Sequence, residues 1–437
     1  MTVRPGPAPQ RLAPVIGLGI AIAAFFVYWL TNRSFEAGRG DFFYLAEAFL
    51  GGKVWIDFVP GAYDVIYGDA GRILVPFAPF PAIVLMPLVK VFGAITADRW
   101  ESGINAGLAA VGVLLAWWVT GRMGVRQLRD RFGLVVLLGF GTQMWWVTTR
   151  GGVWHTGHLI AIILAMLMLA ELFGKQRALL LGLLVGASFL TRAPVAFAGP
   201  ALALWYLLRP VTGWPSAKRV AGTVDEAAVD GGRDPDDAPD RDRSTTRALL
   251  ASLPWRQWVL LVVGFLPALA FFFFYNNARF GSPFESGYAL ATLPDWLENL
   301  RRQGLFSPVH IPMNLDYLFL HLPIASGQFP YARPDGLGMS VLLTSPGLLL
   351  FLRAPWRDRR TWALAAAAVL VLIPTLLYYG GGWFQFGYRY FLDSVPFVWA
   401  LAVMGVVARG PLRWWAWGLI LWGVGMGAFG VWWTYHL

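Results

Sequence analysis

The sequence contains a succession of apolar runs, most of them long enough to cross a lipid bilayer. A transmembrane helix needs about 17–25 predominantly apolar residues to span the hydrocarbon core. Such runs lie near residues 14–31, 100–121, 132–149, 157–173, 178–191, 194–208, 257–276, 339–353, 361–379, 388–407 and 413–433. They predict an all-α polytopic membrane protein with about eleven transmembrane helices.

The composition agrees with this fold class. The chain is 57% hydrophobic and 14% charged, which is too apolar for a soluble globular domain. Aromatic residues make up 16% of it, as suits a protein with many bilayer interfaces where amphipathic rings settle. The chain has no cysteine, so disulfides and thiolate metal sites are excluded.

Two ambiguous segments decide the expected topology. Residues 77–93 are apolar but contain three prolines and a lysine, which favours a bent helix at the membrane interface. Residues 178–208 are best interpreted as two short helices joined at "TRAP". The basic loops "GRMGVRQLRDR", "GKQR", "RAPWRDRR" and "RGPLR" then fall on one side of the membrane together with the N-terminus.

The positive-inside rule requires such an arrangement. We therefore expect a multi-pass plasma-membrane protein with a cytoplasmic N-terminus and an external C-terminus. Basic cytoplasmic loops also explain the net charge of +10 better than nucleic-acid binding does. The first run, after Arg4 and Arg11, lacks a convincing cleavage site, so we expect a retained span rather than a signal peptide.

Residues 210–256 are expected to form a disordered cytoplasmic linker. They include "DEAAVDGGRDPDDAPDRDRST", which has mixed charge and almost nothing apolar to bury. The linker would separate an N-terminal transmembrane module, residues 1–209, from a C-terminal one, residues 257–437. Two outer segments, 32–99 and 277–338, are rich in aromatic residues, Pro and Gly, and are expected to fold on the membrane surface.

Asp41 lies at the expected outer border of the first span. One interpretation is helix capping, because Asp is a favoured N-cap and "FFYLAEAFL" resembles a helix lying on the membrane. The other is a general base, because a carboxylate beside aromatic residues and lipid can be desolvated and its pKa tuned. Taken alone, the residue does not decide between them.

Three further patterns accompany Asp41. The segment "YLAEAFLGG" follows it, and "GRILVPFAPFPAIVLMPLVKVFG" then combines a basic residue, a Pro-rich turn and an apolar helix. Much later come "YNNARFGSPFESGY" and "FQFGYRYFLDSVPF". Over about residues 10–410 this constellation resembles the GT-C superfamily of membrane glycosyltransferases, in particular enzymes of the protein O-mannosyltransferase and lipid A aminoarabinose transferase type.

The resemblance implies an inverting transfer of a monosaccharide from a polyprenyl-phosphate donor on the outer face of the membrane. It implies that Asp41 is the catalytic base and that short juxtamembrane helices lie in the same loop. Many members have a second acidic residue beside the first. Here the local sequence is Gly40-Asp41-Phe42, which leaves metal dependence open.

The departing lipid phosphate requires fixed cations. Arg72 matches the basic residue that relatives place just before the juxtamembrane helix, and Arg279 and Arg389 are further candidates for donor binding. Arg150, Arg192 and Lys53 are also expected outside. The spacing between Arg389 and Asp393 would place both on one face of an α-helix, which predicts a structural ion pair.

Other outer residues are candidates for holding an acceptor or a metal ion: Asp57, Asp64, Asp69, His155 and His158. The two histidines have helical spacing but no obvious third ligand in the sequence. No P-loop, dinucleotide fingerprint or HExxH motif is present, so no nucleotide cofactor is expected.

Two functions of other classes remain open at this point. A polytopic transporter or lipid flippase would suit the aromatic spans and few intramembrane charges, although such proteins usually show internal repeats. A non-catalytic glycosyltransferase-like partner would suit the absent second acid. The expected partners are a polyprenyl-phosphate-linked sugar, membrane lipids and an acceptor glycan, lipid or protein.

Overall fold

The computed structural model describes residues 8–32, 40–57, 66–68, 71–208, 253–291, 293–382 and 384–436. Helices dominate these residues, so the expected all-α class is confirmed. Among the described residues, six helices are long and apolar enough to cross a membrane. They are α1 (Ala8–Thr31), α5 (Glu101–Arg122), α8 (Val153–Leu172), α13 (Trp255–Phe280), α17 (Arg359–Leu377) and α19 (Trp414–His436).

Shorter helices complete the bundle, and several interrupt runs that the sequence predicts as single spans. They are α6 (Leu128–Gly139), α7 (Met144–Thr148), α9 (Ala178–Phe189), α10 (Ala193–Ala196), α11 (Ala198–Leu207), α16 (Val341–Thr344), the 3₁₀-helices η4 (Pro346–Arg353) and η5 (Arg389–Asp393), and α18 (Val395–Arg409). The pair of helices expected over 178–208 is confirmed. The count of eleven membrane crossings stays a prediction.

The expected spans 132–149, 339–353 and 388–407 are each broken into two helices. Proline explains two of the breaks. Pro346 and Pro396 each stand in the first turn of a new helix, where the missing N–H has no intrahelical partner to lose. A single uninterrupted α-helix over either segment is therefore wrong.

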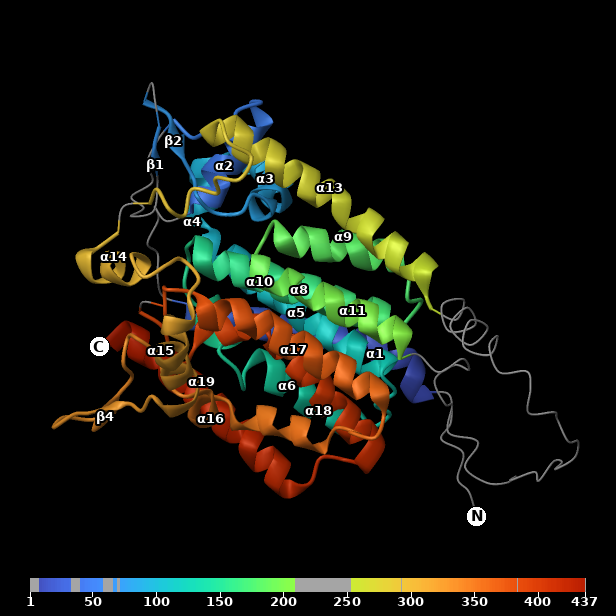
Figure 1. Ribbon diagram of the computed structural model, residues 1–437. Helices are drawn as coiled ribbons and strands as arrows, with labels where there is room; N and C mark the ends of the chain where they lie inside the picture. Colours follow the sequence, from blue (N-terminus) through green and yellow to red (C-terminus); the bar gives the residue numbers. More distant parts are fainter. Residues whose placement is uncertain are drawn as a thin grey trace, which may run out of the picture.

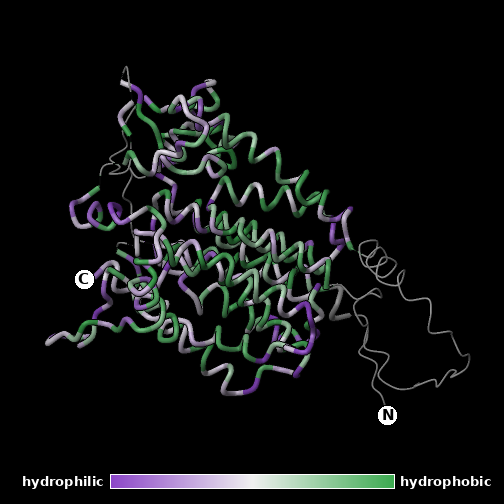
Figure 2. Tube along the Cα trace, viewed as in Figure 1, coloured by the Kyte–Doolittle hydropathy of each residue, from purple (hydrophilic) through white to green (hydrophobic). Residues whose placement is uncertain are grey.

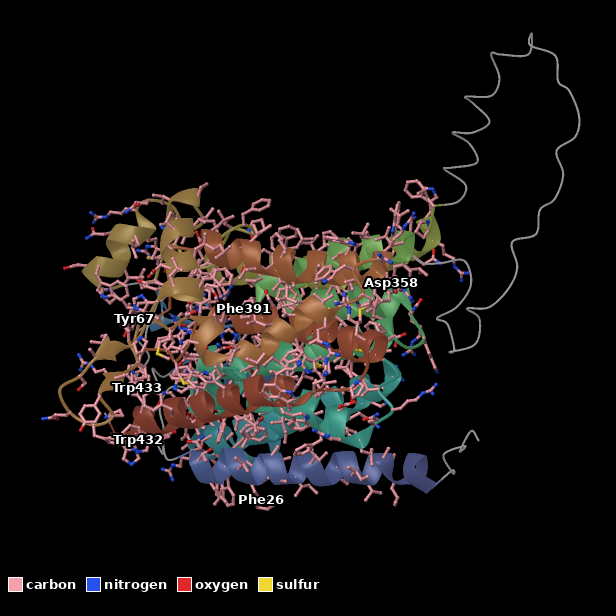
Figure 3. All side chains as sticks on the ribbon, turned by 90° about the horizontal axis from the view of Figure 1, so that it is seen from below. Phe26, Tyr67, Asp358, Phe391, Trp432 and Trp433 are labelled. Atoms are coloured by element: carbon pink, nitrogen blue, oxygen red, sulfur yellow. The ribbon has the colours of Figure 1, made fainter. Side chains whose placement is uncertain are left out.

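The long helices lie side by side, and the two ends of the bundle differ (Figure 1). The start of α1, the end of α11 and the start of α13 lie at one end, whereas α19 finishes at the other. Tyr67, Trp432 and Trp433 lie at this second end, which we call the head end, and Asp358 lies opposite (Figure 3). Hydrophobic residues fill the middle of the helices and hydrophilic ones gather towards both ends (Figure 2).

Helices α9 and α13 approach each other closely through glycine. A Cβ atom at Gly182 would collide with the carbonyl oxygen of Leu261, and one at Gly264 would collide with that of Leu179. Small residues let helix backbones approach within a membrane. This crossing joins helices on either side of the expected linker, most of which lies outside the described residues. The division into two modules stays a prediction.

A small helical module covers the head end, as expected for the first outer loop. It comprises α2 (Asp41–Leu50), α3 (Phe80–Phe92), α4 (Ala94–Arg99) and an antiparallel pair of strands, β1 (Ile66–Tyr67) and β2 (Ile73–Leu74). Its helices share a hydrophobic cluster of their own, which includes Phe43, Leu85 and Val153 of α8. The helix expected within residues 77–93 is confirmed, and its position at the membrane interface stays a prediction.

The second outer segment also carries folded elements. They are α14 (Asp295–Arg301), the 3₁₀-helix η2 (Pro308–His310), α15 (Ile311–Leu315), the π-helix η3 (Asp316–Leu320) and the antiparallel hairpin of β3 (Ile324–Ala325) and β4 (Ala332–Arg333). Figure 1 shows α14, α15 and the hairpin at the head end. The head end is therefore built from both of the segments that the sequence predicts as outer.

Candidate functional site

Asp41 is the first residue of α2 and is fully buried. Gly40, not Asp41, is the N-cap of this helix. The capping interpretation is therefore wrong in its simple form. A carboxylate in the first turn still benefits from the partial positive charge of the helix N-terminus, but that benefit does not require burial.

Two further acidic residues lie near Asp41, although no local pattern in the sequence indicates their proximity. Asp98 at the end of α4 and Glu101 at the start of α5 are both buried. The charges of Asp98 and Asp41 both act on Glu101. A Cβ atom at Gly40 would collide with Asp98 Oδ1, so the backbone at the start of α2 lies close to the Asp98 carboxylate. Buried acids from the junction of α4 and α5 thus lie close to the start of α2.

Polar side chains hold these acids in place. The Tyr44 hydroxyl donates a hydrogen bond to Asp98 Oδ2 over 3.3 Å. Burial, together with the nearby Asp98 carboxylate, raises the pKa of Tyr44 to about 12. Thr156 Oγ1 lies 3.0 Å from Glu101 Oε1 and 2.9 Å from Asn105 Oδ1. Within the described residues, no group of three His, Asp or Glu side chains could hold a metal ion.

Arg279 and Arg72 both lie near Val75, which belongs to the small helical module at the head end. Arg279 Nη1 donates to the carbonyl oxygen of Val75 over 2.6 Å, and its Nη2 donates to Asn276 Oδ1 over 2.8 Å. The guanidinium lies 3.9 Å from the ring centroid of Tyr275. Arg72, three residues before Val75, is exposed and stacks over Trp55 at 4.5 Å. Arg279 is therefore fixed in place from several sides, whereas Arg72 is held mainly by one ring.

Arg389 is buried at the start of η5. Its backbone N–H donates to Gln385 Oε1 over 3.1 Å. The guanidinium carbon lies 5.8 Å from the ring centroid of Trp154 and 5.4 Å from that of Tyr390. Its Nε is buried without a hydrogen-bond partner among the described residues.

The ion pair expected between Arg389 and Asp393 is wrong. Asp393 instead contacts Arg192, whose Nε lies 2.8 Å from Oδ1 and 2.9 Å from Oδ2. The reason is local: residues 389–393 form a 3₁₀-helix. With three residues per turn, positions i and i+3 share a face and position i+4 does not. Arg389 and Asp393 therefore point in different directions.

His158 completes this buried group. Its Nδ1 lies 3.0 Å from Asp393 Oδ1, and both side chains are fully buried. Its Nε2 has no hydrogen-bond partner among the described residues, and the same holds for Nε2 of His155. His155 Nδ1 lies 3.0 Å from the carbonyl oxygen of Gly151. The Nδ1 atoms of the two histidines therefore have different partners, and their candidate role in metal or acceptor binding stays a prediction.

A row of aromatic contacts connects the acidic group with Arg389. Phe42, next to Asp41, packs against Phe77 with ring centroids 6.2 Å apart. Phe77 packs against Trp154 at 6.1 Å, and Arg389 lies beyond Trp154. The structure therefore joins the start of α2, the start of α8 and η5 in one region at the head end.

The remaining candidates lie apart from this region or outside the described residues. Asp57 is exposed and pairs with Lys53 over 2.6 Å. Asp64 and Asp69 lie outside the described residues. Sequence reasoning missed Asp98, Glu101 and the contact between Arg192 and Asp393. The available signal was the presence of ionisable residues within or beside apolar runs, where charge is rare and usually functional.

Comparison with solved structures finds similar folds at low sequence identity. ArnT from Cupriavidus metallidurans, bound to undecaprenyl phosphate, is 16% identical, with a TM-score of 0.48 over 94% of this chain and 62% of that one. The Archaeoglobus fulgidus oligosaccharyltransferase in the apo form is 13% identical, with a TM-score of 0.48 over 96% of this chain and 55% of that one.

The archaeal oligosaccharyltransferase AglB from Archaeoglobus fulgidus, in complex with an inhibitory peptide and a dolichol-phosphate, is 14% identical, with a TM-score of 0.46 over 97% of this chain and 56% of that one. This chain thus spans less than two thirds of the length of each neighbour. No family model and no curated protein matches the sequence.

Proposed function

We propose that this protein is an integral-membrane glycosyltransferase that moves a monosaccharide from a polyprenyl-phosphate donor to an acceptor hydroxyl on the outer face of the membrane. One observation supports this most. A fully buried carboxylate, Asp41, lies at the head end in the same region as Arg389, connected to it through Phe42, Phe77 and Trp154. The transfer needs a group that takes the proton of the acceptor hydroxyl. On the opposite side of the reacting centre it needs cations that stabilise the departing phosphate.

Each group has a role in a single displacement. Asp41 accepts the proton of the acceptor hydroxyl as its oxygen attacks the anomeric carbon. The bond from that carbon to the phosphate oxygen breaks, and its electron pair leaves with the lipid phosphate. Arg279 and Arg389 stabilise the negative charge that develops there. A single displacement of this kind inverts the anomeric configuration.

Fixed geometry favours Arg279 over Arg72 as a phosphate ligand. Arg279 is held by two hydrogen bonds and a ring, so little rotamer freedom is lost when a phosphate binds. Arg389 has an unsatisfied buried Nε among the described residues, and an unpartnered buried donor is costly unless a ligand completes it. Arg72, exposed on Trp55, would bind the phosphate from the solvent side.

Transfer by purified protein in lipid nanodiscs tests the proposal. A radiolabelled polyprenyl-phosphate sugar is supplied with an extract of envelope acceptors, and labelled product and free lipid phosphate are measured. We expect Asp41→Asn to lower the rate by about 10²-fold or more, because a general base contributes 10²–10⁴-fold. Asp295→Asn, which changes an exposed acid in the first turn of α14, is the matched control.

Full activity of Asp41→Asn would remove Asp41 from the base role. Movement of the labelled lipid across vesicle membranes without any transfer would replace the enzyme proposal with the flippase alternative.

A further inference from the structure

The hairpin of β3 and β4, together with the end of η3 just before it, exposes an apolar surface at the head end. Phe329 is 75% exposed, Leu320 70% and Tyr331 67%. Leu322 and Ile324 are also exposed, and these five residues together are called the hairpin surface. Large apolar side chains gathered on a projecting element indicate a contact with another apolar phase.

The hairpin surface is continuous with the end of a membrane-spanning helix. The ring of Phe329 packs against that of Trp432 in the last turns of α19, with centroids 6.2 Å apart. α19 is one of the six candidate spans, and most of its most apolar stretch is not buried in the protein. Trp432 and Trp433 lie at the head end in Figure 3. A hairpin in contact with these residues is therefore placed at the level where the span leaves the bilayer.

The composition of the hairpin fits that level. Tyr and Trp concentrate at membrane interfaces, where their rings are amphipathic. Arg333 is exposed and lies opposite Ile324 in the strand pair. An arginine beside an apolar residue can keep its charge among lipid phosphates while its alkyl stem lies in the apolar layer. At a bilayer interface, Ile324 can contact acyl chains while the guanidinium of Arg333 contacts lipid phosphates.

We propose that the hairpin surface inserts into the boundary between headgroups and acyl chains of the membrane leaflet at the head end, and that this anchor positions Arg389. The second part of the proposal rests on the proposed function, in which Arg389 contacts the donor phosphate. The lipid bilayer is the partner, because the hairpin surface continues the surface of α19.

A chain of hydrogen bonds connects the hairpin with Arg389. Directly after β4, the carbonyl oxygen of Gly336 accepts from the backbone N–H of Gln385 over 2.9 Å. The carbonyl oxygen of Leu337 accepts from Gln385 Nε2 over 2.6 Å. Gln385 is fully buried, and its Oε1 accepts from the backbone N–H of Arg389. Displacing the hairpin would therefore displace the backbone that carries Arg389.

The base of the hairpin is fixed on its other side as well. His321 Nδ1 lies 2.9 Å from Asp316 Oδ2, and His321 Nε2 lies 3.0 Å from Asp335 Oδ2. Asp335 Oδ1 also accepts from the backbone N–H of Leu337. The segment that contacts Gln385 is thus also hydrogen-bonded to η3. A displacement of the hairpin would therefore move this segment, and Gln385 with it.

Site-specific fluorescence tests the anchor directly, since the chain has no cysteine to replace. Phe329→Cys is labelled with an environment-sensitive dye and placed in nanodiscs of phosphatidylcholine and phosphatidylglycerol. We expect blue-shifted emission and strong quenching by lipids that carry a nitroxide near the headgroup. Gln303→Cys, on an exposed residue just after α14, is the control and should show neither effect.

Water-like emission from position 329 in nanodiscs would overturn the anchor. Emission that depends on protein concentration but not on nitroxide lipids would also overturn it, because a second copy would then cover the hairpin surface. These readouts need no transferase activity, so they remain decisive if the proposed function fails.

The positioning part has its own test. Phe329→Ser combined with Tyr331→Ser should raise the KM for the lipid-linked donor several-fold and leave the melting temperature unchanged, because both side chains are exposed. Gln385→Ala should impair use of the donor while position 329 remains quenched by nitroxide lipids. An unchanged KM for the donor in both variants would show that the hairpin does not position Arg389.

Discussion

His158 Nδ1 lies 3.0 Å from Asp393 Oδ1, although 235 positions separate the two residues in the sequence. Because a carboxylate accepts, Nδ1 is the nitrogen that donates a proton in this contact. Arg192 donates to both oxygens of the same carboxylate. One acid therefore connects α8, the break between α9 and α10, and η5.

Removing this acid should destabilise the bundle strongly. Asp393→Asn leaves the guanidinium of Arg192 without its counter-charge in a mostly buried position. Breaking a buried pair by removing one partner costs about 3–5 kcal/mol. We expect a clearly lower melting temperature in nanodiscs, measured by intrinsic tryptophan fluorescence.

A double substitution separates charge from packing. Arg192→Met with Asp393→Leu replaces the pair by apolar side chains, which is often neutral or stabilising. It should melt above Asp393→Asn alone. If the double variant melts below Asp393→Asn, the packing of these side chains rather than their charge determines the stability.

The position of Asp393 could be predicted from the sequence, but its partner could not. An acid within an apolar run indicates a buried, paired carboxylate, and that is what the structure has. The partner was assigned from α-helical spacing, and the backbone adopts a 3₁₀-helix at that point. Pro396 restricts the residue before it, but that restriction does not determine which type of turn precedes the helix.

The contacts among the acids around Asp41 also could not be predicted from the sequence. Two short helices of the first outer loop are predicted from "FFYLAEAFL" and from the apolar, proline-containing residues 77–93, and the structure contains both. That Asp98 and Glu101 pack near Asp41 depends on how α4 turns back into α5. Contacts of this kind are set by tertiary packing, for which the local sequence carries no signal.

The crossing of α9 and α13 should not tolerate a side chain. In Gly182→Ala the new Cβ would collide with the carbonyl oxygen of Leu261, and backbone atoms cannot move without separating the helices. Overpacking of this kind typically costs about 1–3 kcal/mol. Thermal unfolding in nanodiscs should show the loss.

Gly425→Ala is the matched control for this substitution. It also lies within an apolar helix, but a Cβ there meets no atom within 4 Å. Alanine favours helices over glycine by about 1 kcal/mol, so this variant should melt at the same temperature or higher. Equal losses in both variants would mean that the close approach does not determine stability.

Arg279 should not be replaceable by lysine. Arg279→Lys keeps the charge but cannot donate at once to Val75 and Asn276 and present a further N–H to a phosphate. We expect the KM for the donor to rise, with no loss of folded protein. Arg302→Lys, at an exposed position after α14, should leave the KM unchanged. Normal donor use by Arg279→Lys would show that only charge matters at this position.

His321 should make the hairpin region sensitive to pH. Partial burial opposes the charged imidazole, but the hydrogen bonds and charges of Asp335 and Asp316 outweigh it and raise the pKa of His321 above its ordinary value. Partial burial also opposes the charged form of Asp335. The N–H of Leu337 and the His321 ring nevertheless hold the pKa of Asp335 below its ordinary value.

The signs of these shifts define a pH window. A raised histidine pKa contributes stability that is present below its unfolded value of about 6.5 and is lost as the pH rises through the folded value. The lowered pKa of Asp335 contributes stability that is present above its unfolded value of about 3.9 and is lost as the pH falls through the folded value. The contacts of His321 with Asp316 and Asp335 should therefore stabilise the hairpin most between about pH 4 and 6.5.

Limited proteolysis of the hairpin in wild-type protein and in His321→Gln measures this effect. The wild type should be better protected than the variant at pH 6, and the two should converge at pH 9, where the wild-type imidazole is neutral. The difference should amount to about 1 kcal/mol or less, because these groups are partly exposed and solvent screens them. A protection difference that is equal at pH 6 and pH 9 would mean that His321 acts through its shape and not through its charge.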